Sequence, residues 1–207
     1  SGLLKDVATQ LDTMRGNVEK SPKDATANGR YGLVLATYGR DEGADIAFQR
    51  ARLLAPDEAR WAFYHSCVLR RMGQTDAALA AADAGLSASP DQIDLLVKRG
   101  ELLFDLARFD EAEAELDKAL ASNPKYPLAQ FYKGRIHQQR KQWPEAVERF
   151  EKMVRDGIRV NEVYFNLATA YRMLGDTDKA DAQLKLSQGG SHIKIAGFDP
   201  VNMKFDE

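Results

Sequence analysis

Apolar residues recur along this chain at the three- and four-residue spacing of amphipathic α-helices, in short segments separated by polar turns. An alanine returns every 34 residues without interruption, at Ala44, Ala78, Ala112, Ala146 and Ala180. A proline returns at the same interval in three of the turns, at Pro56, Pro90 and Pro124. Because proline ends a helix, the pattern predicts five consecutive blocks, each with two antiparallel helices.

Small residues occupy the eighth position of every block, at Gly32, Ser66, Gly100, Gly134 and Ala168. A side chain of this size lets two paired helices approach closely, and a larger neighbour fills the space. Gly39, Gly73 and Gly175 come near the predicted end of a first helix, where a left-handed turn is easiest for glycine. Helices this short cannot bury their apolar faces alone, so each pair is expected to stack on its neighbours.

This register resembles the tetratricopeptide repeat family, whose 34-residue pattern has a small residue at position eight and an alanine at position twenty. The resemblance implies an all-α fold, a right-handed superhelical α-solenoid of about 11 helices. The predicted repeats are residues 25–58, 59–92, 93–126, 127–160 and 161–190. The chain departs from the family pattern at the seventh position, where His65, Arg99 and Lys133 replace leucine.

Two segments flank the repeats. Residues 1–24 have apolar residues at helical spacing and are expected to form a half-repeat that caps the first repeat. Residues 191–207 have apolar residues at mostly even steps, which indicates an extended tail burying one side. We expect this tail to cap the solenoid or to mediate self-association.

Composition and charge narrow the function. The 29 basic and 31 acidic residues give a net charge of −2, which argues against nucleic-acid binding by bulk electrostatics. No apolar run is long enough to predict membrane insertion, and the Ser1-Gly2 start indicates a trimmed sequence from which a targeting segment could have been removed. The compartment, cytoplasmic or periplasmic, is therefore left open.

The sequence contains few candidate catalytic residues. His65, His137 and His192 form no metal-binding pair, and no phosphate-binding loop is present. Cys67 is interpreted as a small apolar residue rather than a reactive thiol. The carboxylates of Asp110-Glu111 and Glu113-Glu115 are expected on a solvated helix face. The sequence predicts a protein that is not an enzyme and needs no cofactor.

Partner binding is the remaining class. The family resemblance implies that the first helices line a concave groove through six positions of each block. Those positions hold seven basic and four acidic residues, so the groove carries 7 − 4 = +3. The predicted partner-binding residues are Phe63, Tyr64, Arg70, Arg71, Lys98, Phe131, Tyr132, Arg135, Phe165 and Arg172. Aromatic and arginine side chains together are typical of binding hot spots, although packing between first helices explains the aromatic residues as well.

We therefore predict a non-catalytic scaffold whose groove binds a peptide segment with apolar anchors and some acidic character. The Lys and Asn pair with which some family members clamp a terminal carboxylate is absent, because Phe63 and Cys67 stand at its two positions in the second block. The alternative is an accessory or regulatory module of a larger bacterial enzyme or envelope assembly, with residues 191–207 capping the repeats or mediating self-association.

Overall fold

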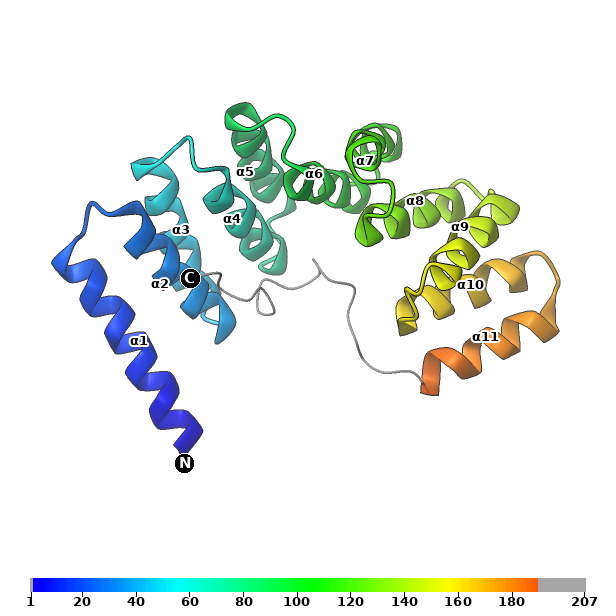
Figure 1. Ribbon diagram of the computed structural model, residues 1–207, viewed down its shortest axis with the longest axis horizontal. Helices are drawn as coiled ribbons and strands as arrows, with labels where there is room; N and C mark the ends of the chain where they lie inside the picture. Colours follow the sequence, from blue (N-terminus) through cyan, green and yellow to red (C-terminus); the bar gives the residue numbers. More distant parts are fainter. Residues whose placement is uncertain (1, 190–207) are drawn as a thin grey trace. The chain divides into compact units, whose positions relative to one another are not determined.

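The computed structural model describes residues 2–189, with side chains for residues 7–188, and these form eleven α-helices without a strand in that range (Figure 1). The helices are α1 (Gly2–Lys20), α2 (Ala25–Thr37), α3 (Asp41–Leu54), α4 (Ala59–Arg71), α5 (Thr75–Ala88), α6 (Ile93–Asp105), α7 (Phe109–Ser122), α8 (Pro127–Gln139), α9 (Trp143–Arg155), α10 (Asn161–Met173) and α11 (Thr177–Gly189). The all-α prediction is confirmed, and each predicted block contains one pair of helices.

The chain divides into two compact units within α6, between Leu102 and Leu103. Unit 1 holds α1–α5 and most of α6, and unit 2 holds the end of α6 and α7–α11. In the description that follows, each unit is treated by itself.

The core of unit 1 depends on glycine where helices cross. A Cβ added to Gly32 of α2 would lie 3.0 Å from the ring of Phe48 on α3, the partner helix of the same pair. A Cβ on Gly29 would lie 2.3 Å from the ring of Trp61 on α4, the first helix of the next pair. The two glycines therefore make room for the aromatic side chains that fill the space within a pair and between pairs.

The same arrangement recurs in unit 2. A Cβ on Gly134 of α8 would lie 2.7 Å from the ring of Phe150 on α9. The alanines at the twentieth position are fully buried in both units, at Ala44, Ala78, Ala112, Ala146 and Ala180. The sequence prediction of close helix contact at these small residues is thus confirmed.

The turn after each first helix contains one residue with positive φ. Gly39, Gly73 and Gly175 have φ of +68°, +76° and +83°, as predicted. At the equivalent positions of the third and fourth blocks, Ala107 and Lys141 have φ of 57° and 59°. A residue with a Cβ is strained in this region, so two of the five turns use a less favourable residue type.

The N-terminal helix packs on the first repeat. Leu11 of α1 contacts the core cluster formed by α2, α3 and α4, and the hydroxyl of Tyr38 donates to Oε1 of Gln10 at 2.7 Å. The half-repeat predicted for residues 1–24 stays a prediction. The predicted tail of residues 191–207 lies outside the described residues, so its capping or self-association role stays a prediction. None of the described helices has both the length and the apolarity needed to cross a membrane.

Replacing Ala107 by glycine is expected to stabilise the protein by about 0.5–1 kcal/mol. The left-handed conformation costs an L-residue about 1–2 kcal/mol, and glycine avoids this strain. Part of the gain is offset because glycine loses more conformational entropy on folding. The matched control is Ala80→Gly in the exposed middle of α5, which is expected to destabilise by about 1 kcal/mol. Urea unfolding measures both changes. Destabilisation by Ala107→Gly would contradict the strain assigned to this turn.

Candidate functional site

The aromatic residues predicted on the first helices of unit 1 pack mainly against one another. Phe63 is buried and Tyr64 half-buried on α4, and their ring centroids lie 5.5 Å apart. The Tyr64 ring also stacks on Phe48 of α3, at 6.0 Å and an interplanar angle of 20°. Tyr64 therefore contributes to the packing between a first and a second helix, and the contact of both side chains with a partner stays a prediction.

The basic residues of the same face are held by ion pairs. The fully buried carboxylate of Glu101 on α6 binds Lys98 of its own helix, and Nη1 of Arg70 on α4 lies 3.2 Å from its Oε1. Lys98 is only 4% exposed, so its ammonium is used within the protein. Burial of such charges is tolerated because each cation has a carboxylate partner. The cluster ties α4 to α6 inside unit 1.

Arg71 has a similar internal role. Its Nε donates to Oδ2 of Asp41 at 2.7 Å, and its Nη2 donates to the carbonyl of Ala36 at 3.0 Å. One guanidinium thus joins the end of α4 to the end of α2 and the start of α3. Arg71, which is predicted to bind a partner, therefore also holds three helices of unit 1 together.

Cys67 of α4 is buried, and the charges that act on it are those of Arg70, Lys98 and Glu101. Burial raises the pKa of its thiol, so the neutral form dominates near neutral pH. The interpretation of Cys67 as a small apolar residue is in agreement with this environment.

In unit 2 the corresponding aromatic residues are also buried, with Phe131 3% and Tyr132 0% exposed. The Tyr132 ring lies edge-on to Phe104 at 5.4 Å and to Phe131 at 5.8 Å. Arg135 of α8 is half-buried, and its guanidinium carbon lies 4.3 Å from the ring centroid of Phe104. The structure therefore brings four groove positions into one aromatic and arginine cluster.

Two predicted site residues of unit 2 reach solvent. Phe165 on α10 is 57% exposed, which is unusual for a phenylalanine in a folded domain. Arg172, two turns further along α10, is exposed, and its Nη2 lies 3.8 Å from Asp181 of α11. Met173 beside it is exposed as well. The first helix of the last repeat thus offers apolar and basic groups to solvent, with Phe165 two turns before Arg172 and Met173.

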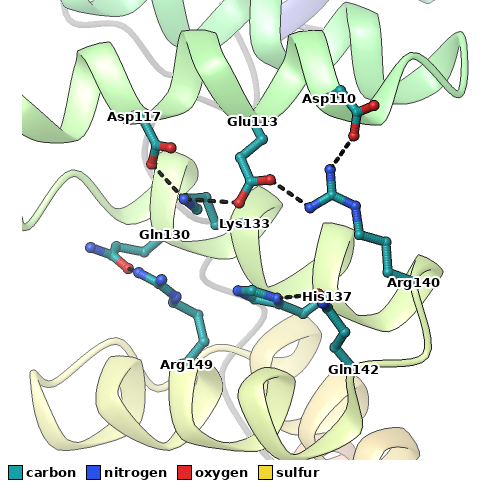
Figure 2. Close-up of polar contacts among 9 residues, drawn as sticks. All are labelled: Asp110, Glu113, Asp117, Gln130, Lys133, His137, Arg140, Gln142 and Arg149. Atoms are coloured by element: carbon teal, nitrogen blue, oxygen red, sulfur yellow. Dashed lines mark hydrogen bonds and ion pairs between the residues drawn. The ribbon is translucent and has the colours of Figure 1, made fainter.

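The acidic stretch of α7 differs from its prediction as a solvated helix face. Glu115 is buried and binds Lys118, and Glu113 is three-quarters buried against α8. Figure 2 shows Glu113 between Lys133 and Arg140, with Asp110 and Asp117 at either side. The prediction was wrong for Glu113 because Lys133 and Arg140 of the following helix pair compensate its burial. It was wrong for Glu115 because Lys118 of the same helix compensates its burial. Burial raises the pKa of Glu113, but hydrogen bonds from Arg140 and Lys133 outweigh this and hold it below its ordinary value.

The three residues that depart from the family pattern at position seven each contact an aspartate on a neighbouring helix. Nζ of Lys133 lies 2.5 Å from Oδ1 of Asp117, and Nε of Arg99 lies 2.6 Å from Oδ1 of Asp83. Nε2 of His65 lies 2.6 Å from Oδ1 of Asp45. In each case a basic group on a first helix meets an acid on the second helix of the preceding repeat. The separation of 16 residues, found for both Lys133–Asp117 and Arg99–Asp83, is the sequence signal that could have predicted them.

His65 is a structural residue rather than a catalytic one. It is buried, its Nε2 lies 2.6 Å from Asp45 and its Nδ1 lies 2.9 Å from Arg52. Because the arginine can only donate, the imidazole is neutral, with Nδ1 accepting and Nε2 donating. His137 lies 2.9 Å from the side-chain oxygen of Gln142. Among the described residues, no group of three or more His, Cys, Asp or Glu side chains could hold a metal ion.

Comparison with protein families gives a consistent result. One family model, described as tetratricopeptide repeat, matches residues 65–127 and 97–158, and a second of the same description matches residues 162–186. Together these ranges span more than half of the chain. No curated protein matches the sequence.

Solved structures share this fold. A tetratricopeptide repeat protein from Parabacteroides merdae is 21% identical with a TM-score of 0.78, over 87% of this chain and 72% of its own. PilF of Pseudomonas aeruginosa is 22% identical with a TM-score of 0.71, over 81% and 77%. YrrB, described as a repeat protein with an unusual peptide-binding site, is 19% identical with a TM-score of 0.65, over 84% and 90%.

The environment of His65 predicts a pH-dependent stability. Burial, opposed in part by the bond to Asp45, lowers the pKa of His65 below that of an unfolded histidine. The unfolded state therefore binds a proton at a higher pH than the native state, so stability falls as pH falls below about 6.5 and levels off below the lowered pKa. Each unit of lowering corresponds to about 1.4 kcal/mol.

Urea unfolding between pH 7.5 and pH 5 measures this effect as the difference between the wild-type protein and His65→Gln, whose amide can keep both hydrogen bonds. The variant is expected to lose the fall in stability. His137→Gln is the control and should keep it. An unchanged pH profile in His65→Gln would contradict the assignment of a buried neutral imidazole.

The contact between Glu113 and Arg140 is expected to stabilise the packing of α7 on α8 by about 1 kcal/mol, the upper end for ion pairs near a surface, because both side chains are more than two-thirds buried. A double-mutant cycle of Glu113→Gln and Arg140→Gln measures the coupling. The exposed pair Arg108 and Glu111 is the control, with an expected coupling below about 0.5 kcal/mol. Equal couplings would show that burial adds nothing to this pair.

Proposed function

The chain belongs to the tetratricopeptide repeat family, and from this premise we propose that it is a non-catalytic scaffold that binds a peptide segment of a partner protein. Repeats of this family are generally scaffolds for protein–protein interaction. Stacked helix pairs serve this purpose because they expose a row of parallel first helices whose side chains a partner can contact together.

We place the binding surface of unit 2 on the first helices α8 and α10. The observation that carries this proposal is Phe165, an aromatic side chain that is 57% exposed on α10. Arg172 is exposed on the same helix, and Arg135 is half-buried on α8. Aromatic and arginine side chains dominate binding hot spots because they combine large contact area with directional hydrogen bonds.

The α8 and α10 helices are in direct contact, because Nε2 of Gln138 donates to the carbonyl of Asn166 at 2.9 Å. Phe165 directly precedes Asn166, and Arg135 lies one turn before Gln138. A peptide that crosses this contact can therefore meet an apolar group and a basic group on neighbouring helices. The proposed partner segment carries an apolar anchor for Phe165 and an acidic residue for the arginine side.

Phe63, Phe131 and Tyr132 are buried, so they support the proposed binding surfaces from beneath and add little to the exposed area. Truncating them would open cavities that cost about 3–5 kcal/mol each, and lost binding would then be inseparable from unfolding. A test of binding has to use exposed residues.

Phe165→Ala is expected to weaken peptide binding about tenfold or more, which is the effect of removing a hot-spot side chain worth at least about 1.4 kcal/mol. Peptides of twelve residues selected from a displayed random library against the wild-type protein serve as ligands, and fluorescence anisotropy measures their affinity. The matched control is Leu186→Ala, an equally exposed apolar residue on α11, the second helix of the same repeat.

Two outcomes would contradict the proposal. Selection that enriches no peptide would argue against a peptide-binding scaffold. Affinities that fall with Leu186→Ala and persist with Phe165→Ala would move binding to the second helices.

A further inference from the structure

The α8 helix carries basic residues on two opposite sides, and the two sides have different surroundings. Lys133 and Arg140 lie seven residues apart, which places them on the same side of the helix, where both bind carboxylates of α7 (Figure 2). Arg135 follows Lys133 by two residues, a rotation of about 200° around the helix. It therefore points away from the acids of α7.

On that other side the Arg135 guanidinium lies on aromatic rings. Its Cζ is 4.3 Å from the ring centroid of Phe104, 5.5 Å from Tyr132 and 5.9 Å from Phe131. These rings are themselves buried and fixed by their mutual edge contacts. A guanidinium that stacks on a ring through its face keeps the N–H groups at its edges available for hydrogen bonds.

Arg135 also differs in its partners from two other arginines of the predicted binding set. Arg70 binds Glu101, and Arg172 lies near Asp181. Arg135 has no hydrogen bond or ion pair to any of residues 7–188. A half-buried arginine held in place by stacking has already lost much of its rotational freedom, so binding an anion costs less entropy there.

We propose that Arg135 selects the partner, an inference that rests on the proposed function. Its guanidinium binds an aspartate or glutamate side chain of the bound peptide through paired hydrogen bonds. The charges around it favour a carboxylate over a phosphate. Lys133, Arg140 and Arg149 are engaged elsewhere, which leaves one positive charge here. A single guanidinium matches the single charge and the fork geometry of a carboxylate.

A paired peptide array tests this directly. Each pair consists of two twelve-residue peptides with the same apolar residues, one containing a single Asp or Glu and the other Asn or Gln in its place. All peptides are acetylated and amidated, so the side chain is the only carboxylate. A third member carries phosphoserine at that position. The array is probed with the wild-type protein, Arg135→Gln, Arg135→Lys and the control Arg155→Gln, an exposed arginine on α9.

The wild-type protein is expected to prefer the acidic member about tenfold, the effect of one charge-assisted hydrogen-bonded contact. Arg135→Gln should bind both members of each pair equally, and this remaining binding shows that the surface is still folded. Arg135→Lys should keep only part of it, because an ammonium lacks the planar fork, and Arg155→Gln should keep it fully.

Four outcomes overturn the inference. Equal binding of acidic and amide members by the wild-type protein, or an acidic preference that survives Arg135→Gln, removes the role of Arg135 and leaves the proposed scaffold function standing. Stronger binding of the phosphoserine members shows that the site selects phosphate instead of carboxylate. If no peptide binds any of the four proteins, the proposed function falls together with the inference.

Discussion

The helix pairs of this protein can bury their apolar side chains only where the two helices approach closely and a neighbouring pair covers what remains. Glycine and alanine set that approach. Gly32 and Gly134 admit the rings of Phe48 and Phe150 within a pair, and Gly29 admits Trp61 of the next pair. The 34-residue interval keeps each small residue opposite its large neighbour, so the spacing of a few small side chains determines where every helix lies within its unit.

Charge then links one repeat to the next. His65, Arg99 and Lys133 stand where the family pattern has leucine, and each contacts an acid on the preceding second helix. An ion pair in a half-buried interface adds little stability compared with apolar packing, but it penalises neighbours that lack the matching charge. Arg135 differs from these residues because it stacks on aromatic rings and has no hydrogen bond or ion pair to any of residues 7–188.

The sequence was sufficient for the fold because a regular interval is visible in five copies. It placed the helix pairs, the small residues of the crossings and the glycine turns. It could not tell buried from exposed charge, since Glu113, Glu115 and Lys98 look like surface residues until the packing around their helices is known. Likewise, only the structure separates Phe165, which reaches solvent, from Phe131 at the same position of the previous repeat, because Phe131 packs against Phe150.

The central claim is that a peptide lies on the first-helix surface of α10 and α8. Site-specific photo-crosslinking tests it most directly, with a benzophenone amino acid at Phe165 and, as the comparison, at Leu53, which is exposed on the second helix α3. The account predicts crosslinks between a selected peptide and the protein labelled at 165, and none from position 53. Crosslinks from position 53 together with none from position 165 would contradict it.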